Sequence, residues 1–356
     1  MRVGILTFHS VPNYGAALQA YALYTAVRSL CDEVEIIDYT SAGIERYYRL
    51  GLPCSPRGAM SYLRKVKKYH RVDRFIRSHV KVGAEGIRGD GYDAIVCGSD
   101  QIWSVESAQG CDLAYFLDFA GDRVRKISYA PSANETDSFG NNREELARLL
   151  KRFHAVSVRD SHTLDLLRKE CGVDACKVVD PTFLVDFDEL IDVPGPGHPY
   201  LLVYLNGRVH EEVVHLICDI SRARRLDIVA IDGFPGGRVQ KRYALGLGEW
   251  LGLFRDADYV VTNTFHGTVF SIKYQKPFTV PLSSHKRAKV YDLLQDLELV
   301  HAAGKAGALD REIDYARVNA ILNGRATASW QYLENALTGG VRSATGPAAV
   351  QKKPDG

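Results

Sequence analysis

Residues Arg2 to Tyr39 decide the fold class, and they read RVGILTFHSVPNYGAALQAYALYTAVRSLCDEVEIIDY. Two runs rich in β-branched residues, Arg2 to Phe8 and Val34 to Tyr39, lie at the two ends of this stretch. Between them, apolar residues recur at spacings of four and three, which predicts one buried stripe along a helix. They are Ala16, Ala20, Leu23, Val27 and Leu30. A strand, a helix and a second strand in this order predict a βαβ unit with parallel strands.

The same alternation continues through the rest of the chain. In the first half, further strands are expected at Ala94 to Gly98, Lys126 to Ala130 and Ala155 to Val158. In the second half, a helix is expected at Val209 to Ala223, among four strand-like runs. These runs are Tyr200 to Leu205, Ile228 to Ile231, Tyr259 to Thr262 and Pro277 to Val280. The pattern predicts an α/β protein with largely parallel sheets.

The segment Pro194 to Pro199, PGPGHP, interrupts this alternation. It suits neither a helix nor a central strand, because prolines lack the backbone N–H and glycines favour no single conformation. A chain of 356 residues also exceeds the size at which one core usually stops growing. We therefore expect two Rossmann-like domains, residues 1–193 and 200–340, followed by a disordered tail at 341–356.

Composition narrows the classes of protein and of partner. The 45 Lys plus Arg nearly balance 43 Asp plus Glu, so no nucleic-acid partner is indicated. Seven cysteines without C-x-x-C spacing predict reduced core thiols and no metal site, in a cytoplasmic protein. Met1 leads directly into a strand, so no signal peptide is expected, and no run approaches the roughly 20 apolar residues of a membrane span.

The turn after the first predicted strand contains Asn13, Tyr14 and Gly15. Open α/β sheets bind ligands at the carboxyl ends of their strands, which is where this turn lies. Asn13 suits a helix N-cap and Gly15 permits close approach to a ligand. A capped turn without a ligand explains the same residues equally well, and the absence of G-x-G-x-x-G gives no indication of a dinucleotide.

Two further strand ends carry polar groups. Ser99 and Asp100 follow the predicted strand at Ala94 to Gly98, where a carboxylate can order sugar hydroxyls or remove a proton. Arg159 ends the strand at Ala155 to Val158, and its fork of donors suits a phosphate or carboxylate. Helix capping for Ser99 or Asp100, and pairing of Arg159 with Asp160 or another acid, are the structural alternatives.

The sharpest segment is Thr262 to Ser271, where a strand ends and a helix begins. Thr264 can cap this helix, whose first turn holds His266, Gly267 and Thr268, and the free N–H groups of such a turn form an anion site. A histidine there is unusual, because the positive helix end disfavours an imidazolium. We expect a bound phosphate to reverse this penalty, so that His266 becomes protonated when substrate binds and serves as a proton donor.

Two basic stretches are less specific. Ser283 to Lys289, which includes Arg287, precedes a predicted helix and can add a cation to the cleft, although a solvated turn explains it as well. The stretch Arg64 to Lys81 carries eight basic residues and one acid. It suits a solvated helix face, or peripheral contact with an anionic membrane surface that carries a lipid-linked substrate.

Together these segments resemble the polysaccharide pyruvyl transferase family. The most distinctive part is Asn13 to Leu23, which matches the family's Asn-Tyr-Gly-Ala-x-Leu-Gln-x-Tyr-Ala-Leu opening. The other matching segments are Gly98 to Trp103, Tyr115 to Phe119, Ile127 to Ala130, Ser157 to Asp160, Asp180 to Thr182, Thr262 to Ser271 and Lys276 to Phe278. Thr264 replaces a common serine and Asp160 a common glutamate, and neither change weakens the resemblance.

The resemblance implies a GT-B-like fold, with two domains facing a cleft, and a cytoplasmic enzyme that meets any lipid-linked substrate at the membrane's inner face. It implies phosphoenolpyruvate as donor, a glycan or lipid-linked precursor as acceptor, and no nucleotide, metal or organic cofactor. By analogy, Arg159 and His266 bind the donor, and Asp100 completes the expected catalytic set. Other expected donor contacts are Thr264, Gly267, Thr268 and Arg287. Expected acceptor contacts are Asn13, Tyr14, Gly15, Ser99 and Asp100, and Ser41 to Ser61 is expected to form part of the acceptor wall.

Two other functions suit the same architecture. A glycosyltransferase that uses a nucleotide sugar would also place a donor phosphate against helix N-termini of the second domain. A non-catalytic glycan-binding protein is the other alternative, although Arg159, His266 and Asp100 at strand ends exceed what a lectin cleft requires. Phosphate release from phosphoenolpyruvate separates the first function from both alternatives.

Overall fold

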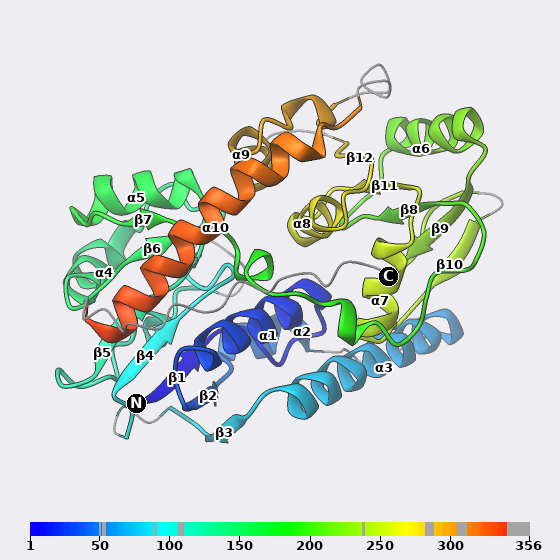
Figure 1. The fold of residues 1–356 in the computed structure, drawn as a ribbon. Helices are drawn as coiled ribbons and strands as arrows, with labels where there is room; N and C mark the ends of the chain where they lie inside the picture. The colour runs from blue at the N-terminus through cyan, green and yellow to red at the C-terminus, as the bar shows by residue number, and fades with distance from the viewer. Residues whose placement is uncertain are drawn as a thin grey trace, which may run out of the picture.

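A computed structural model describes residues 1–49, 51, 55–87, 89, 91–105, 110–236, 239–281, 288–304 and 312–339. Its described strands form two parallel five-stranded sheets and a two-stranded sheet (Figure 1). The first five-stranded sheet has the order β3-β2-β1-β4-β5, and the second has the equivalent order β10-β9-β8-β11-β12. The fold is therefore α/β and GT-B-like, as the sequence predicts.

The strands of the first sheet are β1 (Arg2–Leu6), β2 (Glu33–Asp38), β3 (Val82–Glu85), β4 (Ala94–Cys97) and β5 (Arg125–Ser128). Those of the second are β8 (Tyr200–Tyr204), β9 (Asp227–Ile231), β10 (Val239–Arg242), β11 (Tyr259–Thr262) and β12 (Phe278–Thr279). The small sheet pairs β6 (Ser157–Val158) with β7 (Cys176–Lys177). The expected strand at Ala155 to Val158 therefore exists but lies in the small sheet, next to β5 through an isolated bridge between Ile127 and Ala155.

The described helices surround these sheets. In the first half they are α1 (Tyr14–Arg28), α2 (Ala42–Tyr48), α3 (Pro56–His79), α4 (Arg143–Leu150) and α5 (Ser161–Cys171). In the second half they are α6 (Glu211–Arg224), α7 (Leu247–Arg255), α8 (Phe265–Lys273), α9 (Ala288–Asp296) and α10 (Tyr315–Thr338). The helix expected at Val209 to Ala223 is α6, which ends where Arg225 adopts a left-handed conformation.

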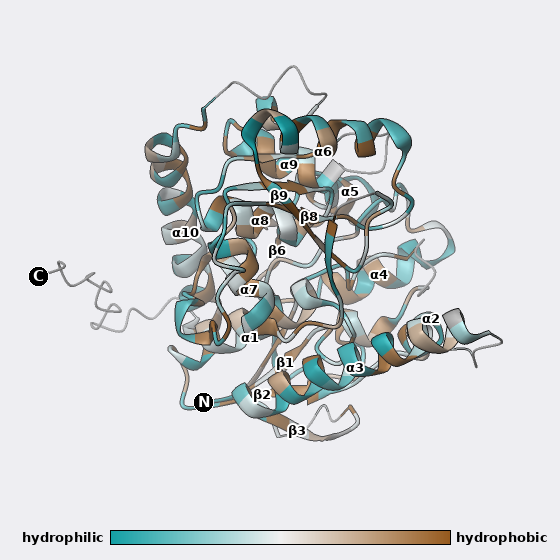
Figure 2. Cartoon of the chain, turned by 90° about the vertical axis from the view of Figure 1, so that its right-hand side faces the viewer, coloured by the Kyte–Doolittle hydropathy of each residue, from teal (hydrophilic) through white to brown (hydrophobic). Residues whose placement is uncertain are grey.

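The second sheet is buried on both faces, as parallel strands usually are. Leu201 and Val203 of β8 belong to the apolar cluster that includes α6, whereas Leu202 belongs to the cluster that includes α7 and α8. Strands β8 and β9 are accordingly hydrophobic in Figure 2, while α6 carries hydrophilic residues among its apolar ones. The latter cluster also includes Tyr14 of α1, so one continuous core joins the helices of the two halves.

Two long helices contact the opposite half of the molecule. Helix α10 runs back to β5 (Figure 1), where Tyr332 Oη donates to Ser128 O at 2.9 Å. In the other direction, α3 extends from the first half toward α7 (Figure 1), and Lys68 pairs with Asp232 at 2.7 Å. The division of the chain at residues 194–199 into two domains stays a prediction, and the expected tail at 341–356 lies outside the described residues.

The cysteines differ in part from the expectation of core thiols. Cys31, Cys97 and Cys171 are buried, but Cys176 in the short strand β7 is exposed. None of the cysteines in the described ranges forms a disulfide, and Cys54 lies outside those ranges. Within the same ranges, no helix is both long enough and apolar enough to cross a membrane.

Candidate active site

The loop between β11 and α8 places His266 at the start of a capped helix. Thr264 Oγ1 accepts a hydrogen bond from Gly267 N at 3.0 Å, and Thr268 Oγ1 donates to Thr264 O at 3.0 Å. Thr264 is therefore the N-cap that the sequence predicts. The cap already uses the Gly267 N–H and the Thr268 hydroxyl, so the expected donor contacts of Thr264, Gly267 and Thr268 stay predictions.

His266 lies directly against the turn that leads into α1. A Cβ atom added to Gly15 would collide with the imidazole of His266, so only a glycine leaves room for the ring at this position. Gly15 comes from the first half of the chain and His266 from the second. The close approach that the sequence predicted for Gly15 is thus made to a histidine of the other half.

Asp180 joins His266 to Arg159. Asp180 Oδ2 lies 2.9 Å from Arg159 Nη1 and 3.7 Å from His266 Nε2. The second distance is that of an ion pair but is too long for a hydrogen bond. His266 Nε2 is buried and has no hydrogen-bond partner among the described residues. The imidazole therefore faces the Asp180 carboxylate with a buried Nε2 that forms no described hydrogen bond.

The charge of Asp180 is strongly stabilised. Burial alone would raise the pKa of this carboxyl, but the nearby His266, Arg159 and Thr182 hold it well below its usual range. Thr182 contributes two hydrogen bonds, from its N at 3.1 Å and its Oγ1 at 2.7 Å, both to Asp180 Oδ1. Asp180 is thus a fixed anion between two groups that the sequence analysis assigned to the donor.

Arg159 does not present its fork to open space. Its side chain is 1% exposed, and a second nitrogen, Nη2, contacts Asp100 Oδ1 at 3.3 Å. Its guanidinium carbon also lies 4.4 Å from the centre of the Phe265 ring. Pairing with acids, the structural alternative considered from the sequence, is therefore what the geometry shows. A direct contact between Arg159 and a donor phosphate would require Asp100 or Asp180 to release one of the guanidinium nitrogens.

Lys289 adds a second cation to this cluster. Its Nζ donates to Asn134 Oδ1 at 3.2 Å. Burial and then the positive charge of Arg159 lower the pKa of Lys289 to about 8, against the opposing effects of Asp100, Asp160 and Glu135. The basic turn predicted at Ser283 to Lys289 thus supplies a cation through its last residue. Arg287, the residue named from the sequence, lies outside the described residues.

The first-half candidates divide into two groups. Tyr14 and Ser99 are buried and engaged: Tyr14 Oη accepts from Leu245 N at 2.9 Å, and Ser99 Oγ donates to Gln19 Oε1 at 2.6 Å. Asn13 is exposed and caps α1 through Ala16 N at 3.3 Å. Asp100 follows β4 in a left-handed conformation, and its side chain is 11% exposed. Of these four, Asn13 and Asp100 retain exposed polar atoms.

Comparison with known proteins adds a family to this geometry. The family model for polysaccharide pyruvyl transferase matches residues 13–285. The chain belongs to this family. The matched range includes Gly15, Arg159, Asp180 and His266, whereas Lys289 lies just beyond its end. Membership implies a pyruvyl transferase that acts on a polysaccharide. No curated protein matches this family member in a search by sequence.

Solved structures resemble this pyruvyl transferase family member at low identity. One is the UDP-GlcNAc 2-epimerase from Neisseria meningitidis bound to UDP-GlcNAc, with 8% identity, 95% of this chain and 98% of that chain covered, and a TM-score of 0.49. A Thermobaculum terrenum O-GlcNAc transferase mutant has 12% identity, 96% and 66% coverage, and a TM-score of 0.47. Arabidopsis thaliana UGT89C1 complexed with UDP-L-rhamnose has 13% identity, 95% and 94% coverage, and a TM-score of 0.43.

The basic stretch of this pyruvyl transferase lies along α3, and much of it faces protein. Arg71 pairs with Glu249 at 3.1 Å, and Arg64 lies 3.7 Å from the centre of the Tyr243 ring. Lys81 pairs with Glu35 at 3.1 Å. These contacts, with that of Lys68 to Asp232, use charges that a membrane surface would otherwise attract. Contact of this helix with a membrane stays a prediction.

Sequence reasoning missed the central role of Asp180 in the pyruvyl transferase. It noted Asp180 to Thr182 only as a segment that resembles the family. Asp180 begins the short 3-10 helix Pro181–Phe183 and accepts from Thr182 in its own turn, which is also what an ordinary capping aspartate does. Its contacts with Arg159 and His266 span 21 and 86 positions of the chain, so the local sequence contained no signal for them.

Proposed function

We propose that this pyruvyl transferase family member moves the pyruvyl group of phosphoenolpyruvate onto two hydroxyls of one sugar in a glycan or lipid-linked precursor. The observation that carries the proposal is the meeting of His266 with Gly15 and Asp180, which brings a histidine of the second half to the polar strand ends of the first. Family membership supplies the pyruvyl chemistry.

The reaction defines what the site must do. Two sugar oxygens bond to C2 of the enol, and the bond between C2 and the phosphate oxygen breaks. The two hydroxyls lose two protons, of which C3 gains one and the departing phosphate the other. The product is a cyclic ketal with a methyl and a carboxylate group. The site must therefore donate a proton to carbon, accept protons from hydroxyls and stabilise the leaving phosphate.

His266 is the proposed proton donor to C3. Its side chain is 11% exposed, and its Nε2 has no hydrogen-bond partner among the described residues. Asp180 is the proposed positioning residue that orients the ring, because its own side chain is only 1% exposed. Arg159 fixes the positions of Asp180 and Asp100 through its two ion pairs. In this arrangement Arg159 acts mainly through the two carboxylates.

The charge balance of the cluster supports a conditional proton on His266. Asp100, Asp160 and Asp180 act on the charge of Arg159, and Glu135 acts with Asp100 and Asp160 on Lys289, so the described carboxylates outnumber the two cations. An anionic donor would add further negative charge to this cluster. Such a donor binds favourably if a proton is taken up with it, and the proposed acceptor of this proton is the imidazole of His266.

Asp100 is the proposed base or acceptor ligand. Its side chain is partly exposed at the carboxyl end of β4, while its Oδ1 contacts Arg159 Nη2 and accepts from Gln101 N at 2.9 Å. These contacts fix one oxygen and leave the second, Oδ2, without a described hydrogen bond. A carboxylate held in this way can accept a proton from a sugar hydroxyl.

The test incubates the full chain with phosphoenolpyruvate and a panel of lipid-linked and model glycosides. We expect phosphate release that depends on a glycoside, together with a mass gain of one ketal-linked pyruvate on that glycoside. Parallel reactions contain UDP-sugars in place of phosphoenolpyruvate. Glycosyl transfer from a UDP-sugar, with no consumption of phosphoenolpyruvate on any glycoside, would contradict the proposal.

A further inference from the structure

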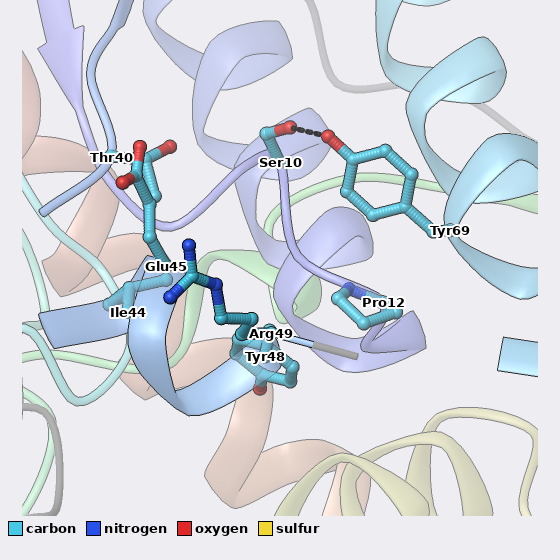
Figure 3. A pocket seen from close by; sticks show the side chains of 8 residues that line it. All are labelled: Ser10, Pro12, Thr40, Ile44, Glu45, Tyr48, Arg49 and Tyr69. Carbon is cyan, nitrogen blue, oxygen red and sulfur yellow. Dashed lines mark hydrogen bonds between the residues drawn. The ribbon is translucent and has the colours of Figure 1, made fainter. Parts of the chain in front are cut away.

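A pocket of about 270 Å³ lies beside the turn that joins β1 to α1. Its walls come from this turn, from Thr40 shortly after the end of β2, from helices α2 and α3, and from the residue that follows α2 (Figure 3). None of the individual residues expected at the active site lines it. Part of its wall falls within Ser41 to Ser61, the segment expected from the sequence to face the acceptor.

The walls of the pocket combine charge, hydroxyl groups and aromatic rings. Glu45 of α2 and Arg49, which directly follows this helix, contribute opposite charges, and neither forms an ion pair among the described residues. On the other side, Ser10 Oγ and Tyr69 Oη are hydrogen-bonded at 3.2 Å (Figure 3). Sugars suit such walls, because their hydroxyls bind charged side chains and their C–H faces pack on aromatic rings.

Tyr48 connects this pocket to the active site. Its ring lines the pocket, and its hydroxyl hydrogen-bonds the side chain of Asn13. Burial and then the negative charge of Asp100 raise the pKa of Tyr48 to about 12. Strand β1 pairs with β4, so the turn after β1 and Asp100, which follows β4, lie at the same edge of the sheet. Pro12, another lining residue, directly precedes Asn13. The pocket therefore lies beside Asp100, on the side of the first half.

We propose that this pocket binds one sugar ring of the acceptor glycan and thereby holds the reacting hydroxyls of the acceptor at Asp100. The volume equals that of about nine water molecules in the liquid and lies near the lower limit of about 300 Å³ for ligand pockets. One sugar ring fits such a volume better than an extended oligosaccharide does. This inference rests on the proposed function, because it names the acceptor subsite of the same reaction.

Charge-removing substitutions on α2 test the pocket. Glu45→Gln and Arg49→Gln each remove one charged hydrogen-bonding group, and we expect each to raise the acceptor KM by roughly tenfold or more. The KM for phosphoenolpyruvate is expected to stay within about twofold, because neither side chain contacts the cluster around Asp180. Arg46→Gln is the matched control, since Arg46 is an exposed arginine of the same helix that does not line the pocket.

A binding measurement without donor separates this inference from the proposed function. Saturation-transfer NMR is recorded on the full chain with methyl glycosides of hexoses, N-acetylhexosamines and uronic acids. We expect transfer to at least one glycoside in the unsubstituted chain and in Arg46→Gln, and its loss in Arg49→Gln. If this pattern appears but phosphoenolpyruvate is never consumed, the sugar-binding role of the pocket is supported and the proposed reaction is contradicted.

The opposite outcomes overturn the pocket. If Glu45→Gln and Arg49→Gln consume phosphoenolpyruvate with an unchanged acceptor KM, the proposed reaction is supported and the proposed acceptor subsite is contradicted. Absence of both glycoside binding and turnover in the unsubstituted chain would also remove it. A thermal unfolding curve for each variant shows whether α2 remains folded, and Tyr69→Phe gives a second substitution from the opposite wall.

Discussion

The two strand-to-helix turns that meet at the active site look alike but use their residues differently. Each holds a histidine near a carboxylate. His9, after β1, lies 3.1 Å from Asp38 through Nε2, and its Nδ1 contacts Thr7 O at 3.2 Å. His266, in α8, lies 3.7 Å from Asp180, and its Nε2 has no hydrogen bond among the described residues. The first histidine has both ring nitrogens in hydrogen bonds, whereas Nε2 of the second has no described hydrogen bond.

The glycines of the two turns differ in the same way. A Cβ on Gly267 would meet the hydroxyl groups of Thr262 and Thr264, which belong to the same turn. A Cβ on Gly15 would meet the ring of His266, which belongs to the other half of the chain. The turn before α8 is therefore built around its own cap and leads into the helix that carries the proposed proton donor, His266. The turn before α1 supplies the space that receives it.

The largest expected effect separates the two histidines. His266→Gln removes the proposed proton donor, and we expect kcat to fall by about 10²- to 10⁴-fold. His9→Gln is the matched control: it disturbs one buried and one partly buried hydrogen bond and should cost about 1 kcal/mol of unfolding free energy while kcat changes little. Steady-state kinetics and urea unfolding measure the two quantities. Equal losses of kcat in both variants would remove the distinction between the turns.

Proton uptake sharpens the same distinction. Calorimetric titration with phosphoenolpyruvate in buffers of different ionisation enthalpy reports the protons taken up on binding. We expect uptake in the unsubstituted chain and in His9→Gln, and markedly less in His266→Gln. Donor binding without proton uptake in any of these proteins would contradict the conditional charge on His266.

The second effect concerns the carboxylate that faces His266. Arg159→Ala leaves Asp180 and Asp100 without their buried cation, so we expect a loss of about 3–5 kcal/mol in unfolding free energy near neutral pH. A depressed carboxyl pKa stabilises the fold above the unfolded value and loses this contribution as pH falls through the folded value. The deficit of Arg159→Ala should therefore shrink below about pH 4. Urea unfolding at several pH values measures this dependence.

The exposed Arg148 provides the control for this experiment. It pairs with Glu145 at 2.6 Å on the surface of α4, and Arg148→Ala should change stability little, because solvent screens an exposed ion pair. A similarly small loss in Arg159→Ala would mean that Asp180 and Asp100 do not depend on the buried guanidinium. We thus expect Arg159→Ala to lower stability before anything else, so any loss of pyruvyl transfer must be measured on protein shown to be folded.

The third effect compares the glycines. Gly15→Ala and Gly267→Ala each force a methyl group into a filled space, which we expect to cost about 1–3 kcal/mol. Only the cost of Gly15→Ala should fall when His266→Ala is added, because the alanine removes the ring that the methyl group would meet. A double-mutant cycle on unfolding free energies measures this coupling. Equal relief for both glycines, or for neither, would contradict the assigned contacts.

Much of this organisation was accessible from the sequence because it is encoded locally. Apolar runs of alternating period predicted β1, β2, β4 and β5, and Thr264 was recognised as a cap because cap and helix lie within a few residues of each other. The short strand β10 was missed, because Val239–Arg242 contains one apolar residue and three polar ones. Such an edge strand resembles a loop in composition.

The cluster of Arg159, Asp180 and His266 could be predicted only in part from the sequence. Arg159 and His266 were named because each occupies a strand-to-helix junction, but their connection through Asp180 depends on contacts between distant segments. The sequence also left open whether Arg159 binds a phosphate or carboxylate of a ligand or pairs with an acid of the protein, and the structure shows it paired with Asp100 and Asp180. The sequence marked the stretch that contains Lys289 only as basic. What distinguishes this lysine is a pKa lowered mainly by burial, and burial depends on the folded chain.

The smallest expected effect tests Lys289, the cation that reaches the cluster from the second half beyond α8. Its pKa of about 8 means that it is protonated below that pH and neutral above it. If this charge attracts the anionic donor, kcat/KM for phosphoenolpyruvate falls by about tenfold as pH rises through about 8, which corresponds to the loss of roughly 1.4 kcal/mol of attraction. In Lys289→Gln the value at pH 7 should already be low, and the step near pH 8 should be absent. A profile of Lys289→Gln that retains this step would assign the titration to another group and leave His266 as the cation that the second half brings to the donor.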